Sequence, residues 1–187
     1  MDYLCLDIVN SSWYITHKLF ADPLKDSKWI ISLADKWNIK GLTPPTPQEL
    51  ELLLKQRNEI SELLAKLVKG LGLKNSDLAL INRYMNSIDY KKNFQLIEGR
   101  YQLSISPLKP QWDLFLSEIA ASFALLCSSD YCKHLKICEN PDCGWYFLDE
   151  SKSHNRKWCD DTCSTLMKVR RFRQRQKNGD YYEKTTH

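Results

Sequence analysis

Hydrophobic positions recur with helical spacing through most of the chain, and this periodicity predicts a mainly α-helical fold. The clearest example is residues 47–69, where leucines and one isoleucine repeat every three or four positions and charged residues fall mostly between them. Thr46 and Glu49 have the spacing of a capping box, with Pro47 at the first helical position. We expect a long amphipathic helix here, ended by Gly70 and Gly72.

Three other segments carry the same helical signal. Residues 28–40 follow a candidate cap at Asp26 or Ser27, and residues 77–88 follow one at Asn75 or Ser76. Residues 111–131 form the most apolar segment, which we expect to be central to the fold. The first 21 residues predict a short apolar segment followed by a helix.

Arg57 is the unusual residue of the segment 47–69. It lies on or beside the apolar face, and none of the residues three or four positions away is an acid. Two interpretations remain open: the arginine points into a ligand pocket, or its aliphatic stem covers the core while its head stays in water.

One segment departs from helical spacing. Residues 93–106 consist of two alternating runs around Glu98-Gly99-Arg100, a pattern typical of a β-hairpin in which glycine supplies the positive φ. Because a two-stranded hairpin is marginally stable in water, we expect it to pack on the helices. Residues 1–135 are therefore predicted to form a multihelical domain with one small hairpin.

Four of the seven cysteines lie near the end of the chain in two short pairs, separated by 15 residues. Such spacing lets four thiolates point at one tetrahedral Zn²⁺. Turn-forming residues surround the first pair, as in a zinc knuckle, and the second pair leads into a helical pattern, the order of a treble-clef-like or ribbon-like finger. We predict one structural Zn²⁺ bound by Cys138, Cys143, Cys159 and Cys163.

These cysteines have other chemical uses. Two disulfides are the first alternative, but the N-terminus has no signal-peptide pattern, so we expect a cytoplasmic protein with reduced thiols. A catalytic zinc needs an open coordination position, which four thiolates close. His154 and Cys132 are alternative ligands, which we interpret as a loop histidine and a bystander.

Positive charge is concentrated around the second cysteine pair. Residues 151–177 hold nine Lys and Arg against two acids, a net charge of +7 in a chain whose total is +4. Leu166, Val169 and Phe172 form a narrow apolar seam along the expected last helix, and most of its remaining surface is cationic. This pattern indicates a polyanionic partner such as duplex DNA. The alternative is a solvated basic tail that only aids solubility. The predicted nucleic-acid contacts are Lys157, Lys168, Arg170, Arg171, Arg173 and Arg175.

Two sequence motifs resemble a known family. Residues 147–159 read FLDESKSHNRKWC and residues 168–175 read KVRRFRQR, similar to the CGNR zinc finger of bacterial proteins. The family's finger follows an ABATE domain, associated with stress-induced transcriptional regulators, whose LDFVNT opening resembles LCLDIVNS at residues 4–11. This chain has Ser164, Thr165 and Leu166 where the family has Gly, Asn and Arg.

These observations lead to three functional hypotheses. The resemblance favours a DNA-binding transcriptional regulator whose domain 1–135 senses a small molecule or stress, with Trp13, Trp29, Trp37 and Trp112 as core residues first and pocket walls second. The alternatives are an RNA-binding or ribosome-associated protein and a protein-interaction adaptor. No nucleophile or phosphate-loop motif indicates an enzyme, and no apolar run is long enough to span a membrane. We expect a finger over 136–178, a flexible tail over 179–187 and a possible oligomer.

Overall fold

The computed structural model describes residues 2–17, 20–107 and 111–177. The chain divides into two compact units, Met1–Lys133 and His134–His187. The predicted tail at 179–187 lies outside the described residues. Within the described part, no helix has both the length and the apolar character that crossing a membrane requires.

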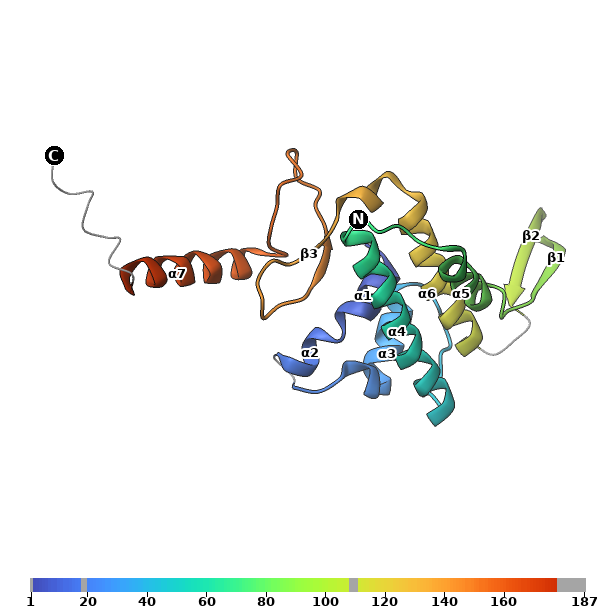
Figure 1. Ribbon diagram of the computed structural model, residues 1–187. Coiled ribbons are helices and arrows are strands. Elements are labelled where there is room, and N and C mark those ends of the chain that lie inside the picture. Colours follow the sequence, from blue (N-terminus) through green and yellow to red (C-terminus); the bar gives the residue numbers. More distant parts are fainter. Residues whose placement is uncertain (1, 18–19, 108–110, 178–187) are drawn as a thin grey trace. The chain divides into compact units, whose positions relative to one another are not determined.

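The structure is mainly helical with two small antiparallel hairpins, as predicted except that only one hairpin was expected (Figure 1). The first unit contains α1 (Leu4–Asn10), α2 (Trp13–Thr16), η1 (Pro23–Lys25), α3 (Ser27–Lys36), α4 (Pro47–Val68), α5 (Asn75–Met85), β1 (Tyr90–Ile97), β2 (Arg100–Pro107) and α6 (Gln111–Ser128). The turn η2 (Asp130–His134) joins the units, and the second unit contains β3 (Leu135–Ile137), β4 (Tyr146–Leu148) and α7 (Asp161–Lys177).

Side-chain caps set the starts of the predicted helices. The capping box of α4 is confirmed, since the Thr46 amide donates to Glu49 Oε2 at 2.7 Å and the Glu49 amide donates to Thr46 Oγ1 at 3.3 Å. Asp26 caps α3 through the Lys28 amide at 2.9 Å. The predicted cap of α5, Asn75 or Ser76, lies one or two residues beyond the observed N-cap residue, Lys74. The Lys74 amide donates a hydrogen bond to Asp77 Oδ2 at 2.9 Å.

The core of the first unit forms around α1 and α6. The predicted apolar segment at the N-terminus is itself helical, and all but one of the seven residues of α1 are buried. This helix packs against α6 and α4, and its Cys5 amide donates to Ser122 Oγ of α6 at 3.2 Å. Burial of both faces explains why α1 shows no polar stripe in its sequence.

The described apolar side chains of the β1–β2 hairpin are exposed rather than packed on the helices, which differs from the prediction. Glu98 and Gly99 form its turn with φ of 49° and 76°, as the glycine pattern indicated. Phe94, Tyr101 and Leu103 are largely exposed on a ladder that stands clear of α5 and α6 (Figure 1). The strands are longer than predicted, at eight residues each. They pair with each other along their full length.

Arg57 has a function that neither sequence interpretation anticipated. Its guanidinium forms a bidentate ion pair with Asp22, with both N–O distances at 2.7 Å, and donates to Ser11 Oγ at 3.1 Å. Both charged side chains are only 8% exposed. The ion pair joins α4 to the start of η1, and the hydrogen bond to Ser11 joins α4 to the end of α1. The acid lies 35 residues away in the sequence and not in the same helix.

We predict that the variant Asp22→Ala loses about 3–5 kcal/mol of unfolding free energy, because the buried Arg57 charge is left without its carboxylate. The matched control is Lys55→Ala, which removes a pair with Glu59 at 4.0 Å whose lysine is 62% exposed. That change should cost less than about 0.5 kcal/mol. Urea unfolding followed by circular dichroism measures both, and equal losses in the two variants would contradict the structural role of the buried pair.

Candidate metal centre

The four predicted cysteine ligands come together in the second unit. The sulfur atoms of Cys138, Cys143, Cys159 and Cys163 all lie within 4.8 Å of one another. Cys143 Sγ is 3.7 Å from Cys159 Sγ, which is 3.8 Å from Cys163 Sγ. A tetrahedral Zn²⁺ with Zn–S bonds of about 2.3 Å places its ligand sulfurs about 3.8 Å apart. The cluster therefore fits one structural Zn²⁺, and these separations are much longer than the roughly 2.05 Å of a disulfide bond.

The first cysteine pair lies in the loop between β3 and β4. Cys138 directly follows β3, and its amide donates to the Trp145 carbonyl at 2.9 Å. The Cys143 amide donates to the Asn140 carbonyl at 2.9 Å, and Gly144 then turns the chain with a φ of 67°. These bonds form the predicted knuckle. The two strands were not predicted, because three residues are too few to show alternation.

The second pair is positioned by the start of α7. Asp160 Oδ1 accepts a hydrogen bond from the Cys163 amide at 2.8 Å, which is the geometry of a helix N-cap. Cys163 lies in the first turn of α7, as predicted. The Glu139 amide donates to the Lys157 carbonyl at 2.9 Å, so the backbone also joins the segments that carry the two pairs.

Asn140 links a metal ligand to the basic helix. Its side chain is buried, with Nδ2 donating to Cys163 Sγ at 3.4 Å. Its Oδ1 accepts from the Asp142 amide at 3.4 Å and from Arg170 Nη1 at 3.3 Å. A hydrogen bond to a ligand sulfur fixes the ligand's orientation. From the sequence, Asn140 is only one of the turn-forming residues around the first cysteine pair.

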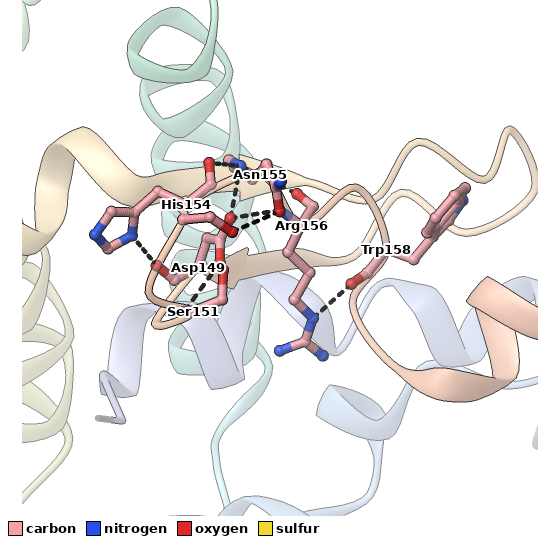
Figure 2. Close-up of polar contacts among 8 residues, drawn as sticks. Asp149, Ser151, His154, Asn155, Arg156 and Trp158 are labelled. Atoms are coloured by element: carbon pink, nitrogen blue, oxygen red, sulfur yellow. Dashed lines mark hydrogen bonds and ion pairs between the residues drawn. The ribbon is translucent and has the colours of Figure 1, made fainter.

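Asp149 organises the insert between the two pairs, and Figure 2 shows polar contacts converging on it. The fully buried carboxylate accepts hydrogen bonds from Lys136 Nζ at 2.7 Å, Ser151 Oγ at 2.6 Å and the Arg156 amide at 2.7 Å. Burial opposes its ionisation, but these hydrogen bonds and the lysine hold the pKa of Asp149 well below its usual range. The Asp-x-Ser spacing, typical of an Asx-turn, was a signal that could have identified it.

Two arginines connect the network around Asp149 to the second cysteine pair and to α7. Arg156 donates through Nε to the Trp158 carbonyl at 2.9 Å (Figure 2) and through Nη2 to the Cys159 carbonyl. Its guanidinium also lies 5.4 Å from the centre of the Phe147 ring. Arg171 of α7 lies 5.4 Å from the centre of the Trp158 ring. The helix is thus held to the insert as well as to the knuckle.

The alternative ligands lie outside the sulfur cluster. His154 Nδ1 is 2.8 Å from the Asp149 carbonyl oxygen, and its ring stacks on His134 with centroids 3.6 Å apart. Cys132 belongs to η2, and neither residue is among the four grouped ligands. This agrees with the interpretation of His154 as a loop residue and Cys132 as a bystander.

The six predicted nucleic-acid contacts fall into two groups. Three are engaged within the finger: Lys157 pairs with Glu139 at 3.2 Å, Arg170 pairs with Asp142 at 2.6 Å, and Arg171 lies over Trp158. The other three are exposed on α7 and form no ion pair within the described part of the chain; they are Lys168, Arg173 and Arg175. The apolar seam of α7 is also exposed, and no residue of this helix is buried.

Comparison with known families adds one finding. Residues 134–176 match the family model of the CGNR zinc finger. The match covers the cysteine cluster, the insert and nearly all of α7, so the four cysteines are the ligands of one structural Zn²⁺ in this finger. The comparison with curated proteins found no match. The positions that depart from the family's tetrapeptide, Ser164 to Leu166, lie in the first two turns of α7.

We predict that zinc binding releases at least two protons per ion at neutral pH. Burial raises the pKa of Cys143 to about 12, and burial together with contact with Cys143 raises the pKa of Cys159 still further, so both are protonated thiols without metal. Zinc binds thiolates, so the apparent affinity falls as pH falls, by about tenfold per pH unit for each proton released. Titration in a weakly buffered indicator solution measures the protons. A Cys132→Ser control should behave as wild type, and release of fewer than two protons per ion would contradict the prediction.

We predict that Asp149→Asn weakens the finger by about 2 kcal/mol, because the buried hydrogen bonds from Lys136 and the loop amides lose their charged acceptor. The measurement is the rate of zinc transfer to a chromophoric chelator, which should increase. Asp130→Asn removes the same charge from a side chain that is 96% exposed and serves as the control. Equal transfer rates in the two variants would show that Asp149 does not support the metal centre.

Proposed function

We propose that the protein binds duplex DNA through α7, with the zinc centre fixing the position of that helix. The observation that supports this most directly is the set of exposed cations on α7 that form no ion pair within the described residues, Lys168, Arg173, Arg175 and Lys177. The one acid in the helix, Asp161, lies at its start. The cationic side chains of such a helix repel one another, and a bound polyanion would neutralise them.

The dimensions of the helix also suit a DNA groove. An α-helix with its side chains is about 10–12 Å across, and the major groove of B-DNA is about 12 Å wide. Spacing of three and four residues places Lys168 and Arg175 on one side of α7 and Arg173 and Lys177 on the other. The two sides match the two phosphate backbones that border a groove, and arginine can also reach guanine edges.

Arg170 and Arg171 are assigned a different function from the one first predicted. Their contacts with Asp142 and Trp158 hold α7 against the knuckle and the insert. We therefore propose that they orient the helix while residues further along it meet phosphates. The order of knuckle, strand and helix supports a treble-clef-like finger.

We further propose that the first unit is the sensory part of a bacterial transcriptional regulator, and that the whole protein is a binding protein rather than an enzyme. The resemblance of residues 4–11 to the opening of the ABATE domain supports this. A recess of about 320 Å³ suits a small effector; it is lined by Trp37, Asn38, Ile39, Lys40, Gln111, Leu114 and Glu118. Gln111 Oε1 is buried without a hydrogen-bond partner in the described part of the chain, so a ligand donor would satisfy it.

We predict that the double variant Arg173→Ala/Arg175→Ala binds duplex DNA more weakly and with a lower salt dependence. Each lost phosphate contact should reduce the slope of log K against log salt by about 0.9. Fluorescence anisotropy of the zinc-loaded chain over a salt series measures both quantities.

The control for this variant is Lys28→Ala/Lys69→Ala, which removes the same charge from exposed positions of the first unit and should leave the slope unchanged. Unchanged affinity and slope in the arginine variant, with zinc still bound, would refute α7 as the binding element. Competition with structured RNA separates the two nucleic acids. Tighter RNA binding would favour the ribosome-associated alternative, and no binding to either would favour the adaptor.

A further inference from the structure

The β1–β2 hairpin gathers four large apolar side chains on one face, and alternation also places the exposed Lys92 at the end of that face. Its register pairs Phe94 with Leu103 and Leu96 with Tyr101, and because side chains alternate along a strand, these four share one face. Their exposed fractions are 72%, 61%, 63% and 76%. The described side chains of the opposite face are mainly polar: Lys91, Asn93, Gln95, Ile97, Arg100, Gln102 and Ser104.

This apolar face, defined as Phe94, Leu96, Tyr101 and Leu103, is preorganised for contact. The rings of Phe94 and Tyr101 stack with centroids 5.6 Å apart, which holds two of the four side chains in place. Soluble monomers seldom expose a contiguous apolar patch of this kind without a binding role. A two-stranded sheet also gains stability when its apolar face is covered.

We propose that two copies of the chain associate through this face, sheet against sheet, across a two-fold axis. The four side chains carry no charge, so the surface that covers them must be flat and apolar, with an acid where it meets Lys92 at the end of the same face. A second copy presents such a surface with matching length and width. The other sheet in the described part of the chain has all three residues of β4 buried, so it offers no comparable exposed face.

The register selects one two-fold arrangement. An axis that runs across the strands, level with Gln95 and its partner Gln102, places Phe94 over Leu96 of the second copy and Leu103 over Tyr101 of the second copy. The same rotation brings the level of Lys92 to the level of Glu98 in the second copy. Opposite charges then meet at both ends of the contact. An axis parallel to the strands would instead bring the two Lys92 residues to the same level.

The size of the face predicts a weak, reversible dimer. Side chains of these types bury enough area for each face to contribute roughly 400–500 Å². The total stays below the roughly 1,200 Å² at which specific stable interfaces begin. The dimer should therefore form and dissociate with protein concentration.

Sedimentation of the zinc-loaded full chain without nucleic acid, over a series of protein concentrations, tests the proposal. Wild type should shift from monomer to dimer as concentration rises. Leu103→Lys and Tyr101→Glu should each weaken association by about tenfold or more, because a charge enters an apolar contact. An equimolar mixture of the two variants should recover it, since the two-fold axis places their opposite charges together.

Matched controls use the polar face of the same strands. Gln95→Glu and Gln102→Lys make similar charge changes and should leave association unchanged. Circular dichroism and zinc content confirm that each variant is folded, as expected for side chains that are largely exposed.

Three results would overturn the proposal: a monomer at every concentration, a dimer unaffected by either apolar-face variant, or no recovery on mixing. A monomer that binds phosphatidylglycerol vesicles, and loses that binding on Leu103→Lys, would assign the face to a lipid surface instead. None of these results depends on DNA binding, so the proposal stands or fails separately from the proposed function.

Discussion

The requirement of one Zn²⁺ for four sulfurs at tetrahedral spacing determines the organisation of the second unit. Two thiolates come from a knuckle and two from the start of α7, so meeting at one ion fixes the angle between the loop and the helix. Asn140 makes this coupling direct, because it contacts Cys163 Sγ and Arg170 with the same side-chain amide. The metal is therefore the part of the structure on which the direction of the basic helix depends.

Each unit also contains a buried carboxylate paired with a cation from a distant position in its own fold. Asp22 binds Arg57, and Asp149 binds Lys136. Both acids accept several hydrogen bonds, as a carboxylate must when it leaves water. In the first unit the ion pair joins helices, and in the second it supports the polar loop that follows the buried strand β4. Similar chemistry thus stabilises two different architectures.

The sequence predicted best those features that repeat or that are coded by nearby residues. The α4 helix and its capping box depend on residues three and four apart, and the cysteine pairs depend on short ligand spacing. The partner of Arg57, by contrast, lies 35 residues away, and no local pattern identifies it. The hairpin itself was predicted but the exposure of its apolar face was not, because alternation shows that a strand has an apolar face but not what covers it. Similarly, helical spacing showed that Arg170 and Arg171 lie on α7 but not that Asp142 and Trp158 contact them.

The position of α1 in the core affects the order in which the protein can form during synthesis. Its Cys5 amide bonds to Ser122, 117 residues later. The ribosome must therefore release most of the first unit before α1 meets α6, and the buried residues of α1 stay exposed to solvent and chaperones until then. The finger differs, because the contacts that hold α7 to its knuckle span 30 residues or fewer. The finger therefore closes over short sequence distances, whereas α1 stays uncovered until α6 has been made.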